Sequence, residues 1–205
     1  MALFIFLLGF IIFLITALYY VIYKKPNDFT KISTLVFFTT TVSYVVLISG
    51  MWLINTPLGQ VIYPSRWLFY ILSCSLLMYE IAKILNKSTV QTIQIIVLNS
   101  LVMLTGFFAS ITEFSIKWLF FILSSLIFLV LLKIIYQKDG KQTQFMNDTR
   151  CFIIWTWTLF PIVWLLAPTG IGIFTAFSTA FLYLLLDITT KILFSHFAAK
   201  GQYKL

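Results

Sequence analysis

A carboxylate and an amine stand four residues apart in an otherwise apolar run of the chain, as Asp187 and Lys191. Residues four apart lie one turn from each other on the same face of a helix, so the two side chains are expected to meet. Each charge costs about 2.5–3.5 kcal/mol at the centre of a membrane-spanning helix, so the pair should face the interior of a helix bundle. A lysine amine in an apolar pocket is the usual site of a Schiff base with an aldehyde. The pair could also be a structural ion pair without chemistry, because buried pairs can be retained for specificity.

A second set of polar residues lies on an apolar segment nearer the N-terminus. Arg66, Ser73 and Glu80 follow one another at intervals of seven residues, which keeps them on one face of a helix with only slow drift. Phe69 lies on the same face. The 14 positions from Arg66 to Glu80 correspond to roughly 21 Å of helix, so the two charges lie near opposite ends of a membrane span. Either charge could instead reach the membrane interface, and Glu80 could pair with the lysines that follow it.

An aromatic segment surrounds a proline at position 161. Trp157, Phe160 and Trp164 lie on one face of the predicted helix, and Pro161 is expected to kink that helix and to free backbone groups. The three rings could be ordinary packing between helices. They could also form the flat walls of a slot for a long conjugated ligand beside the lysine.

The composition is that of an integral membrane protein. Of the 205 residues, 61% are hydrophobic and only 10% are charged, which is more apolar surface than a water-soluble domain of this size can bury. The apolar runs are too long for the strands of a membrane barrel. The first run has neither a basic flank nor a small-residue cleavage site, so we interpret it as a spanning helix and not as a signal peptide.

We expect an all-α, multi-pass membrane protein in which a single domain, residues 1–205, forms a bundle of seven transmembrane helices. Polar breaks between the apolar runs set the limits of the spans. The predicted spans are Leu3–Tyr23, Ser33–Ile54, Tyr63–Leu85, Val90–Ile111, Phe114–Tyr136, Thr149–Leu166 and Ile171–Ala199.

Basic residues are unevenly divided between the two sides of this bundle. With seven spans, the first, third and fifth loops lie on the side of the C-terminus, and that side holds eleven lysines and arginines. They are Lys24, Lys25, Lys31, Lys83, Lys87, Lys133, Lys138, Lys141, Arg150, Lys200 and Lys204. The opposite side holds Lys117 alone. The positive-inside rule therefore predicts an N-terminus outside the cell and a cytoplasmic C-terminus. We expect the protein to be a multi-pass protein of the plasma membrane.

Several other polar residues are expected to take no part in chemistry. Glu113 and Lys117, four apart near an outer loop, are expected to form a solvated pair, and His196 is expected at the membrane interface. Cys74 lies within a span and Cys151 near a loop, so a disulfide between them is not expected. No group of residues has the spacing of a metal site, and loop lysines beside a membrane do not indicate nucleic-acid binding.

The chain resembles the microbial rhodopsins over nearly its full length. Lys191 falls at the lysine that carries retinal in that family, and Asp187 falls at the counterion of the last helix. Trp157, Pro161 and Trp164 match the W-x-x-x-P-x-x-W signature of the retinal pocket. The resemblance implies retinal, all-trans in the dark and covalently linked to the lysine, and it implies no enzymatic activity.

Other positions extend the resemblance along the third to sixth spans. Arg66 matches the outward-side arginine of the third helix, and Ser73 and Cys74 match the two residues beneath the retinal. The remaining positions assigned to the pocket are Tyr70, Asn99, Gly106, Phe121, Ser124 and Phe160. The family resemblance also implies a homo-oligomer, most simply a trimer.

The departures from the family pattern indicate a subgroup. Outward proton pumps carry an acidic acceptor three positions after the third-helix arginine, where this chain has Phe69. Tyr70 replaces the usual tryptophan, and Ser75 replaces the usual proline. Phe69, Ser73 and Glu80, with a cysteine after the serine, form a motif similar to that of the schizorhodopsins. That resemblance implies light-driven inward proton transport.

The residues themselves favour the same direction. Asp187 is the only carboxylate expected near the lysine, since Phe69 cannot accept a proton and Arg66 repels one. A proton that leaves the lysine is therefore expected to pass the serine–cysteine pair toward Glu80 and the cytoplasm. Reprotonation is then expected from the extracellular side.

Other functions stay open on sequence alone. The main alternative is a sensory photoreceptor that signals to a separate transducer protein. A light-driven chloride pump is less favoured, because Phe69 offers no hydroxyl or amide to hold an anion. A light-gated channel and a seven-helix transporter without retinal are further alternatives. In each case the lipid bilayer is a partner, and protons are the cargo of the favoured function.

Overall fold

The computed structural model describes residues 2–56, 60–138 and 140–201, and seven helices within these ranges are long and apolar enough to cross a membrane. Six of them are α1 (Ala2–Tyr23), α2 (Asp28–Ser49), α3 (Pro64–Ile84), α4 (Thr89–Ile111), α5 (Phe114–Tyr136) and α6 (Gln144–Leu166). The seventh span, Ala176–Ala199, consists of α7 (Ala176–Asp187), η1 (Ile188–Leu193) and most of α8 (Phe194–Gly201). The expectation of a seven-helix membrane protein is confirmed.

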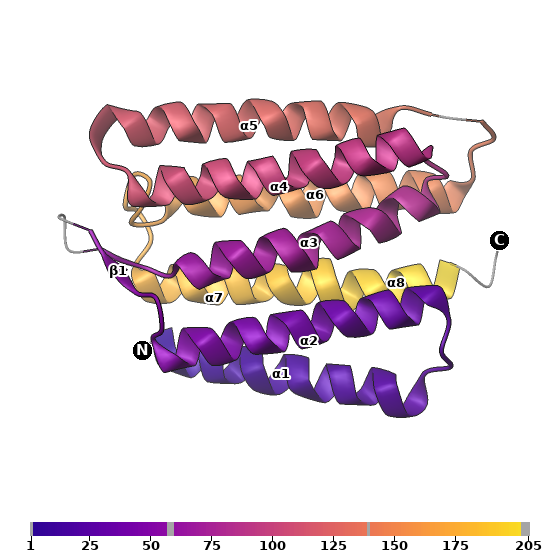
Figure 1. Cartoon of the computed structure of the whole chain (residues 1–205), viewed down its shortest axis with the longest axis horizontal. Coiled ribbons are helices and arrows are strands. Elements are labelled where there is room, and N and C mark those ends of the chain that lie inside the picture. Colours follow the sequence, from indigo (N-terminus) through magenta and orange to yellow (C-terminus); the bar gives the residue numbers. More distant parts are fainter. Residues whose placement is uncertain (1, 57–59, 139, 202–205) are drawn as a thin grey trace.

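The helices lie side by side and alternate in direction, so the loops gather at two ends of the bundle (Figure 1). One end, which we call the hairpin end, holds the start of α1, the α4–α5 and α6–α7 loops, and an antiparallel pair of short strands, β1 (Ile54–Asn55) and β2 (Val61–Ile62). The other, which we call the lysine-rich end, holds the α1–α2, α3–α4 and α5–α6 loops and the end of α8. The seventh span packs against α1, α2 and α6, so other helices surround it.

Two caps set the limits of α2, which begins and ends five residues before the predicted span Ser33–Ile54. At its start, the Asn27 side chain accepts a hydrogen bond from the N–H of Thr30, whose hydroxyl accepts one from the N–H of Asn27. This capping box adds a polar first turn that hydropathy does not reveal. At its end, Gly50 adopts a left-handed conformation with φ 67°, and its N–H donates to the carbonyl of Leu47. A glycine in this conformation ends a helix, so the residues after it are free to enter β1.

Threonine caps set the starts of the last two spans. α6 begins five residues before the predicted Thr149, because the Thr143 side chain accepts a hydrogen bond from the N–H of Met146. α7 begins five residues after the predicted Ile171, because Thr175 caps it in the same way. Both predicted starts were wrong for the same reason: a cap depends on side-chain oxygen atoms, and hydropathy does not register them.

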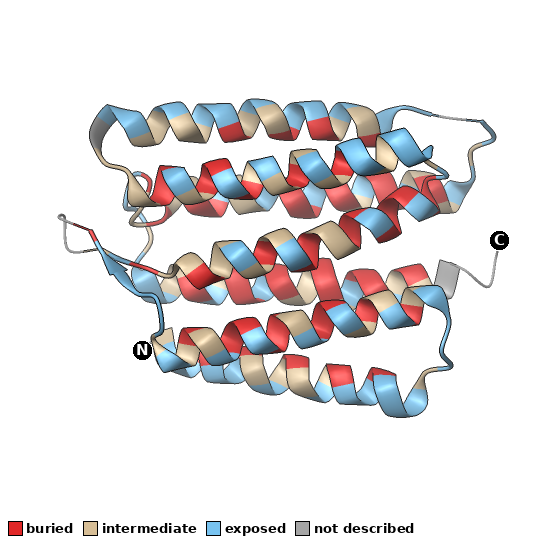
Figure 2. Cartoon of the chain, in the orientation of Figure 1, coloured by how far each residue is buried: buried red, intermediate tan, exposed pale blue. Residues whose placement is uncertain are grey.

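Buried residues face the inside of the bundle, and exposed residues face outward along most of the helices (Figure 2). The outward positions are largely apolar, and Leu119 for example is 67% exposed. The interior contains polar and charged side chains, and Glu80, Arg150, Asp187 and Lys191 are all buried. Lipid accepts an apolar surface, whereas charges must lie inside, so this arrangement is that of a multi-pass membrane protein.

Arg150 is buried inside the bundle, although the sequence places it among the basic residues of the cytoplasmic loops. It is 2% exposed, on α6. Its Nε donates to the carbonyl of Ile135 on α5 over 3.2 Å, and its Nη1 donates to Oδ1 of Asn147 over 3.2 Å. The guanidinium therefore ties the start of α6 to the end of α5.

Candidate functional site

Lys191 lies in a turn of π-helix that interrupts the seventh span at Ile188–Leu193. The three residues Ile188–Thr190 are β-branched and lower the helix propensity of this segment. The Thr189 hydroxyl donates to the carbonyl of Leu185 over 2.8 Å, and the Thr190 hydroxyl donates to that of Leu186 over 2.7 Å. Such π turns occur frequently at functional sites. This one holds a lysine whose exposure is only 1%.

Asp187 is the centre of a compact hydrogen-bonded group. Its Oδ1 lies 2.6 Å from Nζ of Lys191, and its Oδ2 accepts hydrogen bonds from the hydroxyls of Tyr44, at 2.9 Å, and Tyr70, at 3.2 Å. The ammonium also lies 4.6 Å from the ring centroid of Tyr70 and 6.0 Å from that of Phe13. Because both charges are buried, the hydrogen bonds and the ring faces compensate for their lost hydration. The expected meeting of carboxylate and amine therefore occurs, with two phenols added.

Tyr44 is a site residue that the sequence did not single out. It lies on α2, and its hydrogen bond to Asp187 joins positions 143 apart in the chain. Its ring stacks on Phe13 of α1 with centroids 5.8 Å apart, and a Cβ atom at Gly9 would overlap it. A glycine within an apolar span was the one available signal, because it permits a close approach. The sequence does not say which residue makes that approach.

A cavity of about 490 Å³ with mainly apolar walls lies beside this group. It extends from the middle of the bundle to β2 and the α6–α7 loop at the hairpin end. Of the positions assigned to a retinal pocket, those that line it are Tyr70, Asn99, Gly106, Phe121, Ser124, Trp157, Phe160 and Trp164. Among the described residues, Lys191 and Asp187 do not line it, and neither do Ser73 and Cys74. The amine lies 4.6 Å from the centroid of the Tyr70 ring, which forms part of the cavity wall.

Aromatic rings and a glycine shape the walls. Trp164 stacks on Phe121 with centroids 4.7 Å apart and planes 13° apart, and its Nε1 donates to the hydroxyl of Ser110 over 2.8 Å. Gly106 allows a wall ring to pack closely, because a Cβ atom there would lie 2.8 Å from the ring of Trp67. These contacts place flat ring surfaces from α3, α5 and α6 around the cavity, and α4 supplies the glycine and the serine that they pack against.

The cavity fits the ligand that the sequence predicts. Its volume of about 490 Å³ lies within the range of roughly 300–1,000 Å³ usual for small-molecule pockets. Asn99 Nδ2 and Trp157 Nε1 are buried in its walls without a hydrogen-bond partner in the described part of the chain. Flat aromatic walls, few polar atoms and a buried amine at one side suit a long apolar polyene with an aldehyde, such as retinal.

Arg66 lies on the hairpin side of the Asp187 group. It is half-buried, and its guanidinium carbon lies 4.9 Å from the ring centroid of Tyr183 and 5.7 Å from that of Phe6. All three residues line the cavity. Arg66 thus places a positive charge inside the bundle, held by ring faces, and does not reach out to the membrane interface.

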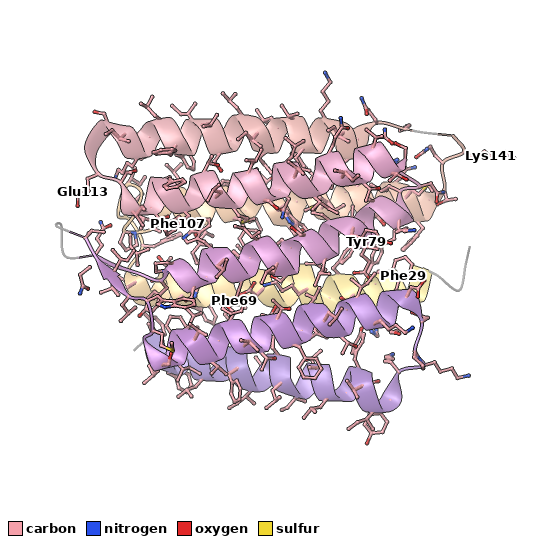
Figure 3. The ribbon with its side chains drawn as sticks, in the orientation of Figure 1. Phe29, Phe69, Tyr79, Phe107, Glu113 and Lys141 are labelled. Carbon is pink, nitrogen blue, oxygen red and sulfur yellow. The ribbon has the colours of Figure 1, made fainter. Side chains whose placement is uncertain are left out.

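Phe69, Ser73 and Cys74 follow one another along α3. The Ser73 hydroxyl donates to the carbonyl of Phe69 over 2.8 Å, and Cys74 packs against Tyr70 and Met103. Figure 3 places Phe69 in the hairpin half of α3 and Tyr79 nearer the lysine-rich end. The side chain of Phe69 has no group that could accept a proton.

Glu80 is 0% exposed, although it lies near the lysine-rich end of α3. Its Oε1 accepts a hydrogen bond from the hydroxyl of Ser33 on α2 at 3.2 Å, and its Oε2 has no partner in the described part of the chain. It does not pair with Lys83, whose ammonium lies 5.5 Å from the ring centroid of Tyr79. Glu80 contributes to the wall of a second cavity, of about 440 Å³. The other residues of that wall are Asp28, Phe29, Lys31, Ile32, Tyr79 and Lys83; Figure 3 labels Phe29 and Tyr79 at this end.

The predicted solvated pair of Glu113 and Lys117 does not form. Lys117 Nζ donates instead to the carbonyls of Thr169, over 3.2 Å, and Gly170, over 2.9 Å, in the α6–α7 loop. Glu113 is the N-cap of α5, with φ −116° and ψ 172°. The prediction was wrong because spacing by four places two residues on one face only when both lie within a helix.

A family model described as "Bacteriorhodopsin-like protein" matches residues 1–205 of the chain. The crystal structure of schizorhodopsin 4 is similar with a TM-score of 0.88 and 40% sequence identity, covering 96% of this chain and 97% of that one. The thermophilic rhodopsin from Rubrobacter xylanophilus has the same fold, with a TM-score of 0.90 at 22% identity over 98% of this chain and 96% of that one.

Two further relatives are named for different functions, one as a sensory rhodopsin and one as a bacteriorhodopsin. Sensory rhodopsin-2 of Haloarcula vallismortis is 22% identical over 160 residues, which cover 74% of this chain and 67% of the relative. Bacteriorhodopsin-II of Haloarcula marismortui is 25% identical over 192 residues, covering 87% of this chain and 76% of the relative. The predicted resemblance to microbial rhodopsins, and to schizorhodopsins in particular, is confirmed.

Proposed function

Because the chain belongs to the bacteriorhodopsin-like family of seven-helix retinal proteins, we propose that it binds retinal at Lys191 and carries protons inward across the membrane in the light. The similarity to schizorhodopsin 4, at 40% identity, supports this function over the others open to the family. The residues of the site supply a physical reason for the direction.

In this proposal, the hairpin end faces the outside of the cell and the lysine-rich end faces the cytoplasm. The positive-inside rule supports this orientation, since loops rich in lysine stay in the cytoplasm. Lys141 belongs to the α5–α6 loop, and Figure 3 shows it at the opposite end of the bundle from Glu113.

Lys191 would hold retinal covalently, and Tyr70, Trp157, Phe160 and Trp164 would form the walls around it. When bound, retinal supplies a light-driven isomerisation and a protonated Schiff-base nitrogen in place of the lysine amine. The side chains around it exclude water and limit the directions in which that nitrogen can find a partner.

On the hairpin side, Asp187 balances the positive charge at position 191, and it accepts hydrogen bonds from the phenols of Tyr44 and Tyr70. Phe69 offers no second acceptor, and the cation of Arg66 opposes the passage of a proton toward the hairpin end. A proton that leaves Nζ of Lys191 therefore has no favourable route outward among these residues.

The observation that carries the proposal is a fully buried carboxylate, Glu80, on the other side of the lysine. The ten positions of α3 from Tyr70, beside the lysine, to Glu80 correspond to roughly 15 Å of helix. Ser73 and Cys74 lie along this distance. Because its Oε2 has no partner among the residues that the structure describes, and the residue borders a cavity at the lysine-rich end, Glu80 can attract a proton and pass it to cytoplasmic water.

Light-induced pH changes test the proposal directly. Cells that make the protein, supplied with retinal and suspended in weakly buffered medium, should make the medium more alkaline on illumination, and a protonophore should abolish the change. Lys191→Ala cells provide the control for effects of light alone. Acidification of the medium would refute inward transport.

A sensory function is the second candidate, because relatives named sensory rhodopsins match this chain at 22% and 27% identity. The same pocket would then move a helix against a separate transducer protein without net transport. Illumination that changes the visible spectrum for seconds but leaves the external pH unchanged would favour this function over pumping.

A further inference from the structure

The loop between α6 and α7 covers the hairpin end of the larger cavity. Three of its residues, Ala167, Pro168 and Thr169, contribute to the cavity wall, together with Gln60 next to β2. Arg66 lines the same cavity farther in. On the proposed orientation, this loop therefore separates the extracellular solution from the interior that contains Arg66.

Two side chains from outside the loop hold it in place. Gln60 Nε2 donates to the carbonyl of Pro168 over 2.5 Å. Lys117 Nζ, on α5, donates to the carbonyls of Thr169, over 3.2 Å, and Gly170, over 2.9 Å. Three consecutive carbonyls are thus bound by side chains from two distant parts of the chain, and all three bonds go to the loop backbone.

Backbone hydrogen bonds give the loop an internal structure and attach it to the end of α6. Ile171 N–H donates to the carbonyl of Leu165 over 2.8 Å, and Gly172 N–H donates to that of Ala167 over 3.0 Å. Gly170 is required inside this turn, because a Cβ atom there would overlap the carbonyl of Leu165. Leu165 belongs to α6, so these bonds also attach the turn to the end of that helix. Breaking the bonds to Gln60 and Lys117 frees the other side of the turn, and water can replace them.

The lysine contact also connects to the wall of the cavity. The Lys117 ammonium lies 5.0 Å from the ring centroid of Trp118, and that ring meets the edge of Trp164 with centroids 6.3 Å apart and planes at 90°. Trp164 lines the cavity. A movement of Trp164 can therefore displace Trp118 and change the hydrogen bonds from Lys117 to the loop.

We propose that Lys117 and Gln60 are positioning residues that keep the α6–α7 loop closed over the cavity, and that their release admits water to the cavity and to Arg66 from the hairpin end. If this water returns a proton to the site during transport, that role rests on the proposed function. The closed loop itself does not, because it follows from contacts of the chain alone.

Thiol labelling measures this access without any assay of transport. Ala180 is buried and lines the cavity near the loop, so Ala180→Cys in a Cys151→Ser background reports entry into the cavity. The retinal-loaded protein in nanodiscs is treated in the dark with a small polar maleimide, and the reaction of the parent without Ala180→Cys is subtracted. Ile173→Cys, at a site that is 66% exposed, reports the reactivity of a freely accessible thiol.

Lys117→Met should raise the labelling rate at position 180 by about tenfold or more, because it removes hydrogen bonds from a charged donor. Gln60→Ala should raise it by about two- to tenfold, as for a neutral bond. Lys117→Arg, which keeps the charge and the donors, should stay near the parent rate. Lys133→Met, at the other end of α5, is the matched control. Labelling of Ile173→Cys should not change in any of these variants.

An unchanged rate at position 180 in both Lys117→Met and Gln60→Ala, with the visible band intact, would overturn the proposal. If Lys117→Met loses its visible absorption band, the labelling rate of Gln60→Ala alone tests the proposal. Faster labelling in the Lys117→Met and Gln60→Ala variants, together with no light-induced pH change from the parent protein, would support the closed loop and count against the pump. A pH change with unaltered labelling would support the pump and overturn the role of the loop.

Discussion

The phenol of Tyr44 donates a hydrogen bond of 2.9 Å to Oδ2 of Asp187, so α2 holds the carboxylate that faces the lysine of the seventh span. Tyr70, on α3, donates to the same oxygen over the longer distance of 3.2 Å. Three transmembrane elements therefore meet at a single carboxylate. A movement of any one of them changes the electrostatic field at Nζ of Lys191.

Tyr44→Phe should lower the free energy of unfolding by about 1.5–3 kcal/mol, the usual contribution of a hydrogen bond to a charged group. The ring and its stacking on Phe13 are retained, so the loss reports the hydroxyl alone. Thermal denaturation in the dark, followed by the visible band and by circular dichroism, measures it. Tyr136→Phe, at an exposed position of α5, should have no effect. Equal losses in the two variants would show that the bond to Asp187 does not stabilise the fold.

Lys191→Ala should prevent formation of the coloured protein and, without retinal, should destabilise the fold by about 3–5 kcal/mol, because it leaves Asp187 buried and unpaired. The double variant Lys191→Ala/Asp187→Asn should recover much of that stability but no colour, since an amide carries no charge. Denaturation without retinal and absorption spectra after retinal addition measure the two effects. A visible band in Lys191→Ala would refute the assigned linkage, and a double variant no more stable than the single one would refute the electrostatic explanation.

The sequence predicts the spans and the central pair because both depend on local spacing. Apolar runs define helices, and positions four apart on a helix must meet, as Asp187 and Lys191 do. The helix ends were missed where a cap decides them, as at Gly50. Tyr44 and Ser33 were missed because their partners lie 143 and 47 positions away, and no local pattern encodes such contacts.

Ser33→Ala should slow inward transport by about two- to tenfold, because it removes the donor to Oε1 of Glu80, and a typical hydrogen bond contributes about 0.5–1.5 kcal/mol. The colour should not change, since the contact lies near the lysine-rich end and apart from the lysine. Ser49→Ala, on the exposed hairpin end of the same helix, is the matched control. Initial rates of light-induced alkalinisation measure the effect. Equal rates in the two variants would show that the bond from Ser33 plays no part in transport.

Glu80→Gln should slow transport more severely, by roughly a hundredfold, which is at the low end of what a positioned proton-transfer group contributes. The amide keeps the size of the side chain and its hydrogen-bonding capacity toward Ser33, but it cannot attract a proton as a carboxylate does. The visible band should remain, because Glu80 does not belong to the group around Asp187. Glu113→Gln, which removes a carboxylate from the hairpin end, should transport at the parent rate. Normal transport in Glu80→Gln would show that protons reach the cytoplasm by another route, and the direction of pumping would then rest on Asp187, Phe69 and Arg66 alone.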